Sequence, residues 1–199
     1  MALNGPTASM VGGVALLERA LGYTCGALAL VRPGLMGSPT PCHGWNLARL
    51  LTHMSHSLDT LEQAADGSRM GLADDDSVAA RVATGHDPVA ALRERGRRTL
   101  AAWANAAGSE PVIVGGAPLS AAIVATAGAI EVLAHGWDVG CACGCRRPVP
   151  AALAEELLDL APLLVPVADR DGCFGPAVPS PVTATSSERL IAYLGRDPR

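Results

Sequence analysis

The sequence contains no lysine and few aromatic residues. All 15 basic residues are arginine, and Phe, Trp and Tyr together make up 3% of the 199 residues. The core must therefore be built from Ala, Leu and Val, which favours closely packed helices over a sheet rich in aromatic residues. With few aromatic rings to stack on bases and a net charge of −4, nucleic-acid binding is not expected. Arginine without lysine, beside abundant Ala and Gly, is typical of a GC-rich genome and fits an actinobacterial source.

Long hydrophobic runs are also missing. No uninterrupted apolar stretch reaches the roughly 18 residues of a membrane-spanning helix, and residues 1–9 lack the basic start of a signal peptide. We therefore expect a cytoplasmic protein without a membrane partner, with its six cysteines mostly reduced. Their spacing does not fit a secreted disulfide framework.

The spacing of apolar residues predicts an all-α fold. Helices are expected over 10–31, 45–65, 87–107, 118–140, 150–165 and 186–194. The short β-branched segment 111–116 is predicted to be a strand or an extended linker. Four long helices with loops of mixed length predict an up-and-down four-helix bundle with short extra helices and a small β segment. We expect a single domain over 1–199, with 171–199 as a C-terminal extension packed on it.

The most apolar predicted helix, 118–140, carries an acidic side chain and an imidazole. Glu131 and His135 lie four residues apart, so their side chains share one helix face. A buried, unpaired carboxylate is costly, so a metal, an arginine or a hydrogen-bond network must compensate it. Imidazole with carboxylate suits Zn²⁺, Ni²⁺ or Fe²⁺. The pair therefore predicts either a metal site or an ordinary intrahelical contact.

His53, on the predicted helix 45–65, is the candidate third ligand from across the bundle. Two nitrogens and one carboxylate would leave a position open for water or substrate, as in catalytic sites. His56 lies close to the same face and is the other candidate for the third ligand. Alternatively, His56 is a histidine at the surface or rim without a role in metal binding. Asp138 follows His135 by three residues and could hold its other ring nitrogen. Helix-end polarity is the other interpretation of Asp138.

Cys141, Cys143 and Cys145 alternate in one short segment. Alternating thiolates can bind soft metals, although a complete zinc site needs four ligands and wider spacing between paired cysteines. Small-residue packing at a helix end is the second interpretation. The third is sensitivity to oxidation, because Arg146 and Arg147 could lower a thiol pKa. The role of these cysteines stays open.

Three separated stretches resemble one protein family. Residues 40–45 read Thr-Pro-Cys-His-Gly-Trp and are followed by His53, and residues 131–138 read Glu-Val-Leu-Ala-His-Gly-Trp-Asp. Phe-Gly-Pro at 174–176 and the tail 189–198 complete the pattern. In this order the stretches are similar to the mycothiol-dependent maleylpyruvate isomerase group of the DinB/YfiT-like superfamily, and the tail resembles an actinobacterial branch of it. Cys42, within the first stretch, is interpreted as a packed residue and not as a nucleophile.

The resemblance implies a DinB-like bundle, often dimeric, that binds one divalent metal. Carried onto this chain, the ligands are His53, Glu131 and His135, and the metal is Zn²⁺, with Ni²⁺ or Fe²⁺ as alternatives. His56, Trp45 and Asp138 are expected beside the ligands or in a substrate pocket. Mycothiol is implied as a cosubstrate.

We therefore expect a metal-dependent enzyme that uses a low-molecular-weight thiol, by resemblance mycothiol, for S-transfer to an electrophilic small molecule or for its isomerisation. Two alternatives stay open: a non-catalytic stress-response module that binds a metal or small ligand, and a tailoring enzyme of secondary metabolism on the same scaffold. The expected partners are a small-molecule substrate and a second copy of the chain in a homodimer.

Overall fold

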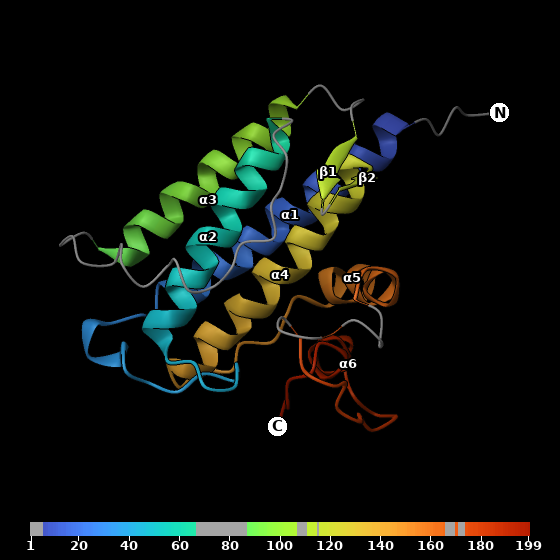
Figure 1. Ribbon diagram of the computed structural model, residues 1–199. Coiled ribbons are helices and arrows are strands. Elements are labelled where there is room, and N and C mark those ends of the chain that lie inside the picture. The colour runs from blue at the N-terminus through green and yellow to red at the C-terminus, as the bar shows by residue number, and fades with distance from the viewer. Residues whose placement is uncertain (1–5, 67–86, 107–110, 115, 166–169, 171–173) are drawn as a thin grey trace.

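Four long helices lie alongside one another in the computed structural model, which describes residues 6–66, 87–106, 111–114, 116–165, 170 and 174–199. They are α1 (Pro6–Leu28), α2 (Leu47–Ala65), α3 (Pro88–Asn105) and α4 (Ala121–Ala142), as Figure 1 shows. Two shorter helices follow: α5 (Ala151–Leu164) lies against α1 and α4, and α6 (Ser186–Tyr193) lies against α5. The predicted all-α bundle with short extra helices and a small β segment is confirmed.

The long helices form two parallel pairs. Arg95 of α3 pairs with Asp59 of α2, and Arg98, three residues later, pairs with Glu62, also three residues later. Because the pairs advance together along both helices, α2 and α3 run in the same direction. α1 and α4 form the other pair and run opposite to α2 and α3 (Figure 1). This order refines the up-and-down prediction, which assumed strict alternation. The segment between α2 and α3 is long enough for the next helix to start again from the same end of the bundle.

Side-chain caps and a hairpin set the helix starts. Asn46 accepts a hydrogen bond from the Arg49 backbone N–H at 2.9 Å, so α2 begins after Trp45. α4 begins three residues later than predicted, because β1 (Val112–Val114) and β2 (Ala117–Leu119) form an antiparallel hairpin before it. α1 begins at Pro6 and ends at Leu28, earlier at both ends than the expected range 10–31. Sequence periodicity therefore finds the helices, and local hydrogen bonds decide their ends.

α1 packs closely and extensively against α4. The Thr24 hydroxyl donates to the Val132 carbonyl at 2.8 Å, and a Cβ atom built on Gly136 would lie only 2.3 Å from Thr24 Oγ1. A larger residue at Gly136 would therefore push the helices apart. Small residues at this contact let α4 occupy the centre of the bundle.

Among the described residues, α4 is the helix that is long and apolar enough to cross a membrane by length and composition. In the structure, 78% of the 18-residue stretch of α4 that meets this criterion is buried inside the protein. Such burial is what the central helix of a bundle requires, and it accounts for the hydrophobicity of this segment.

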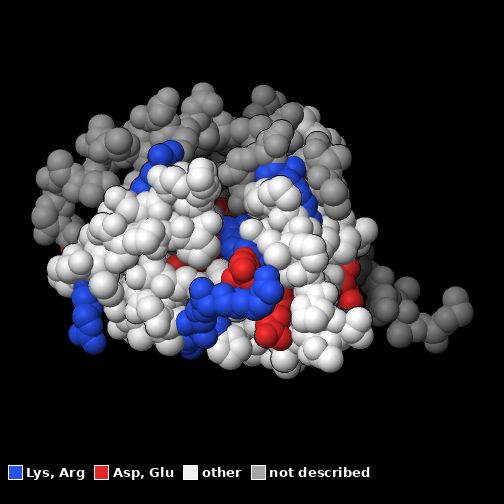
Figure 2. Space-filling view, turned by 90° about the horizontal axis from the view of Figure 1, so that it is seen from below, with Lys and Arg blue, Asp and Glu red and all other residues white. Residues whose placement is uncertain are grey.

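The C-terminal segment follows α6 and lies at the lower end of the bundle in Figure 1. Viewed from below, basic and acidic side chains meet near the middle of this face, between largely uncharged surfaces (Figure 2). One residue of the segment, Arg196, is only 4% exposed. The chain end therefore contributes a buried charge to the bundle.

Candidate metal centre

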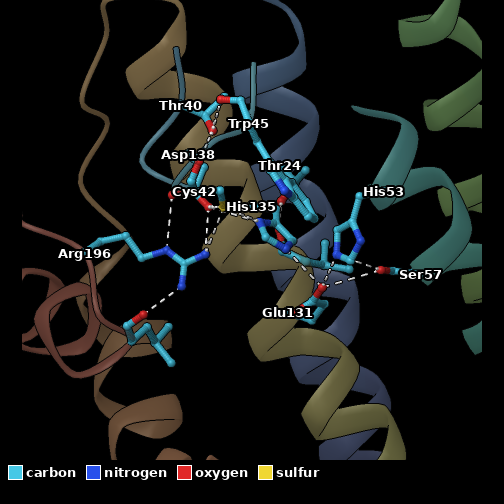
Figure 3. Close-up of polar contacts among 12 residues, drawn as sticks. Thr24, Thr40, Cys42, Trp45, His53, Ser57, Glu131, His135, Asp138 and Arg196 are labelled. Carbon is cyan, nitrogen blue, oxygen red and sulfur yellow. Dashed lines mark hydrogen bonds and ion pairs between the residues drawn. The ribbon is translucent and has the colours of Figure 1, made fainter. Parts of the chain in front are cut away.

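Three nitrogen and oxygen donors meet between α2 and α4 (Figure 3). Glu131 and His135 lie one turn apart on α4, and His53 reaches them from α2. Glu131 Oε1 lies 2.9 Å from His53 Nε2 and 3.0 Å from His135 Nε2. The three residues that the sequence singles out as ligands are thus neighbours, with their donor atoms all within 4.8 Å of one another.

The central imidazole is buried, and one of its nitrogens has an ion-pair contact but no hydrogen bond. His135 is 2% exposed, and its Nε2 makes no hydrogen bond, although Glu131 Oε1 is 3.0 Å away. Buried polar atoms almost always have a hydrogen-bond partner, so an exception points to a missing ion, water or ligand. The direction of the Nε2 lone pair is therefore available to a cation lying between His135, Glu131 and His53.

The charges around this point are strongly coupled. Burial by itself would raise the pKa of Glu131, but His135 and His53 outweigh burial and hold that pKa well below its ordinary value. Burial would lower the pKa of His135, but Glu131 and Asp138 raise it well above its ordinary value. The site therefore favours an ionised carboxylate with a positive charge beside it.

This donor set fits a divalent transition metal. Two imidazole nitrogens and one carboxylate are the ligands of many zinc enzymes, in which a fourth position stays open for water or substrate. The exposure of the side chains leaves such an opening, since Glu131 and His53 are 18% and 24% exposed while His135 is enclosed. We conclude that these three residues could hold a metal with one side accessible.

The other nitrogen of the His135 ring faces a second polar cluster. His135 Nδ1 lies 3.0 Å from Asp138 Oδ2. Arg196 Nη2 donates to the same oxygen at 2.9 Å, and the Cys42 thiol donates to it at 3.1 Å. Arg196 Nη2 also lies 3.4 Å from Cys42 Sγ. Asp138 is thus fully enclosed by partners, one of which is a guanidinium.

Asp138 is held in its ionised form. Burial alone would raise its pKa, but hydrogen bonding to His135 and the charge of Arg196 lower it below the ordinary value. An ionised Asp138 accepts the Nδ1 proton of His135, so that a neutral ring, as in a metal-bound state, carries its lone pair on Nε2, facing Glu131 and His53. The expectation that Asp138 could hold the second ring nitrogen thus has a geometric basis.

The remaining predicted residues lie at different distances from the centre. The Trp45 ring centroid is 4.8 Å from that of His53 and 6.4 Å from that of His135, so Trp45 covers the site from the loop before α2. His56 is half-buried on α2 and is absent from both clusters of metal-type ligands in the described residues. His43 is exposed in its loop.

Two residues of the site were not predicted from the sequence. Cys42 was interpreted as packed, and its half-buried Sγ does touch His135 and Asp138, at 3.7 and 3.1 Å. Arg196 entered only through the tail motif, because nothing in a linear sequence links it to a residue 58 positions earlier. An unpaired acidic residue in an apolar helix was the one available signal that an arginine must come from elsewhere.

The alternating cysteines do not form a ligand set within the described residues, and all three are free thiols. Burial and the nearby Asp138 carboxylate raise the pKa of Cys141 to about 11, outweighing Arg146. Burial also raises the pKa of Cys143. The idea that the adjacent arginines activate these two thiols is therefore wrong, because desolvation of the thiolate dominates.

A narrow pocket leads into the bundle beside the candidate ligands. Its cavity volume is only about 20 Å³, and Glu131 and His135 form part of its wall. The other lining residues come from all four long helices and are mostly apolar. The space beside the donors therefore has room for about one water molecule.

Fold and site together define a helical-bundle protein with a buried cluster of two histidines and one carboxylate. The family model of the mycothiol maleylpyruvate isomerase N-terminal domain matches residues 17–140. The chain belongs to this family, as the sequence resemblance predicted.

A crystal structure of the mycothiol-dependent maleylpyruvate isomerase is similar to this structure. The TM-score is 0.62 at 19% sequence identity, and the match covers 94% of this chain and 82% of that chain. At this identity the likeness shows a shared fold. No curated protein sequence matches the chain.

Proposed function

We propose that this protein is a metal-dependent enzyme that transfers a low-molecular-weight thiol to an electrophilic carbon, or isomerises a substrate through such an adduct. His53, Glu131 and His135 hold the metal, with Zn²⁺ as the first candidate. The observation that carries the proposal is the buried Nε2 of His135, which has no hydrogen bond and faces Glu131 and His53. Membership of a family named for a mycothiol isomerase supports mycothiol as the thiol.

The metal supplies one chemical function. A divalent ion with an open position lowers the pKa of a thiol that it coordinates, so that thiolate forms near neutral pH. Thiolate is the nucleophilic form of sulfur.

Addition to an activated alkene needs no oxidant. The sulfur forms a bond to one alkene carbon, the π electron pair moves to the other carbon, and that carbon takes up a proton. The former double bond is now a single bond and can rotate. If the proton is then lost again, the double bond forms anew, the carbon–sulfur bond breaks, and the isomerised alkene leaves with the thiol regenerated. Stopping at the adduct gives S-conjugation.

The residues of this chain supply orientation and exclusion of water. Asp138 fixes the tautomer and angle of the His135 ring through Nδ1, and Arg196 keeps Asp138 ionised. Trp45 packs against His53, and the apolar side chains beside Glu131 limit the water that reaches the site.

The proposal is tested by following adduct formation. Purified protein is incubated with mycothiol and an activated alkene, with zinc or with a chelator, and the thioether is quantified by mass spectrometry. We expect adduct formation above the uncatalysed rate with zinc, and its loss with the chelator. Equal rates in both samples would contradict the role of the metal.

A matched pair of variants separates the ligand from its neighbour. His53→Gln removes a proposed ligand, whereas His56→Gln changes the same residue type three positions along the same helix. Activity should fall to the background rate in the first variant and persist in the second. A protein that binds zinc and mycothiol in every sample but forms no adduct with any alkene would instead be a binding module.

A further inference from the structure

Two buried arginines bind the C-terminal end of α6. The helix ends at Tyr193, and the last carbonyl groups of a helix have no partner within it. Arg170 Nη1 donates to the Tyr193 carbonyl at 2.6 Å. Arg196 Nη1 donates to the next carbonyl, that of Leu194, at 2.7 Å. Because the helix dipole is negative at this end, it favours both positive charges.

Arg170 also holds the loop that packs against this end. The same Nη1 donates to the Gly175 carbonyl at 3.1 Å. Gly175 lies so close to Gly195 that a Cβ atom built on Gly195 would clash with the Gly175 carbonyl. Gly195 has a φ of 81°, and this left-handed turn directs the chain into Arg196. Arg170 therefore joins the two segments whose contact sets where Arg196 begins.

Arg196 carries this placement to the metal centre. Its Nε and Nη2 donate to the two carboxylate oxygens of Asp138, at 3.3 and 2.9 Å (Figure 3). A paired contact of this kind is sensitive to the position and angle of the guanidinium plane. The Phe174 ring, from the loop that Arg170 holds, lies 5.3 Å from the Arg196 guanidinium carbon. Asp138 in turn contacts His135 Nδ1 at 3.0 Å.

Stability alone does not account for a guanidinium at the Arg170 position. Arg170 is 7% exposed, and its Nε and Nη2 are buried without a hydrogen bond. Buried donors without partners destabilise a fold. The contacts that Arg170 does make are the two carbonyl bonds and the Tyr193 ring, whose centroid lies 4.6 Å from its guanidinium carbon. What these contacts secure is the geometry of the segment before Arg196.

We propose that Arg170 is a positioning residue for the metal centre. By bonding both the end of α6 and the loop beside it, Arg170 places Arg196 on Asp138, and Asp138 then orients the His135 ring. The inference rests on the proposed function, because the centre that Arg170 serves is the one assigned there.

The first test observes Arg196 in metal-free, full-length protein by NMR. The exchange rate of the Arg196 Nε–H with water is measured, and its signal is assigned by its absence in Arg196→Lys. Arg170→Met keeps an apolar side chain of similar length but cannot bind the carbonyls. We expect exchange to become at least about tenfold faster in this variant, because the pairing with Asp138 opens more often. Unaltered exchange in Arg170→Met would overturn the proposal.

Three further variants separate positioning from general disturbance. Arg170→Lys can still donate to the carbonyls and should keep slow exchange at Arg196. Arg170→Gln reaches less far and serves in place of the methionine variant if that protein does not fold. Tyr193→Phe removes a 2.8 Å hydrogen bond to the Val165 carbonyl but keeps the Tyr193 ring and carbonyl. Fast exchange in Tyr193→Phe as well would show that any change near α6 has this effect, and would contradict the assigned role.

The second test is a double-mutant cycle on zinc affinity. Competition with a chromophoric chelator is measured for wild type, Arg170→Met, Asp138→Asn and the double variant. Arg170→Met should weaken zinc binding by about three- to tenfold, less than the loss of a group that contacts a ligand directly. In the Asp138→Asn background it should cause no further loss, because the link passes through Asp138. An equal loss in both backgrounds is what general destabilisation gives, and it would overturn the proposal.

The two tests distinguish this inference from the proposed function. If the wild type binds no zinc, the metal centre and the proposed function are wrong, while the exchange at Arg196 still decides whether Arg170 places it. If zinc binds and the thiol adduct forms, but Arg170→Met changes neither exchange nor affinity, the proposed function stands and Arg170 has no positioning role.

Discussion

The two sides of the His135 ring differ in how their charges are balanced. On the Nδ1 side, the carboxylate of Asp138 is neutralised by Arg196 and hydrogen-bonded by Cys42. On the Nε2 side, the carboxylate of Glu131 faces two imidazoles, and Nε2 itself has no hydrogen bond. A buried carboxylate needs a positive partner. On the Asp138 side that partner is Arg196. On the Glu131 side it is an imidazole whose pKa is raised, and we propose that a metal takes over this role when it binds.

This contrast separates two clusters that look alike by residue type. Cys42, His135 and Asp138 form one group of potential metal ligands, and His53, Glu131 and His135 form the other. In the first group the guanidinium of Arg196 already contacts the sulfur and the carboxylate. A metal would have to displace it. We therefore propose the second group as the metal centre and the first as its support.

The largest effect is expected from removing the guanidinium. Arg196→Ala leaves Asp138 buried without its cation, which typically costs about 3–5 kcal/mol of unfolding free energy. Chemical denaturation of metal-free protein measures this loss. The control is Arg199→Ala, which breaks a pair that is exposed, with the two side chains 81% and 55% accessible. Similar stability of the two variants would show that the Asp138 side does not depend on its arginine.

The next effect concerns the link between the two sides. Asp138→Asn removes the charge that orients His135, and losses of this kind weaken metal binding by about 10–100-fold. Competition with a chromophoric chelator measures the zinc affinity. Asp159→Asn, an exposed change on α5, serves as the control. Unaltered zinc affinity in Asp138→Asn would mean that the two sides of the ring act independently.

The smallest effect is a change in thiol reactivity. The pKa of Cys141 is raised to about 11, first by burial and next by the Asp138 carboxylate. At pH 8 little thiolate is present, so iodoacetamide should label Cys141 slowly and faster as the pH approaches 11. Removing the negative charge in Asp138→Asn lowers this pKa, so the rise in rate begins at lower pH. Peptide mass spectrometry measures the labelling, and an identical pH profile in both proteins would contradict the influence of Asp138.

Much of the α2–α4 site was predictable, because the spacing of residues within a helix determines which side chains share a face. Glu131 and His135 share a face through helical periodicity, and the same periodicity places His53 on α2. That the two helices bring these faces together came from the family resemblance. Arg196 was not predictable, because its pairing joins the chain end to α4 by tertiary packing alone.

The fold shows the same division between local and distant information. Apolar periodicity located every α-helix of the described residues to within a few residues. It did not give the parallel direction of α2 and α3, which depends on the length and path of their connection. The β-branched segment 111–116 gave the first strand of the hairpin before α4, but β2 was missed, because a three-residue strand is too short to show a period.

The central claim is that the cation lies on the Glu131 side of His135 and not on the Asp138 side. Elemental analysis of purified protein tests it with two isosteric variants, Glu131→Gln and Cys42→Ser. We expect about one zinc-type ion per chain in the wild type and in Cys42→Ser, as in a site with three protein ligands, and almost none in Glu131→Gln. Retained metal in Glu131→Gln together with its loss in Cys42→Ser would place the ion in the other cluster and contradict the account.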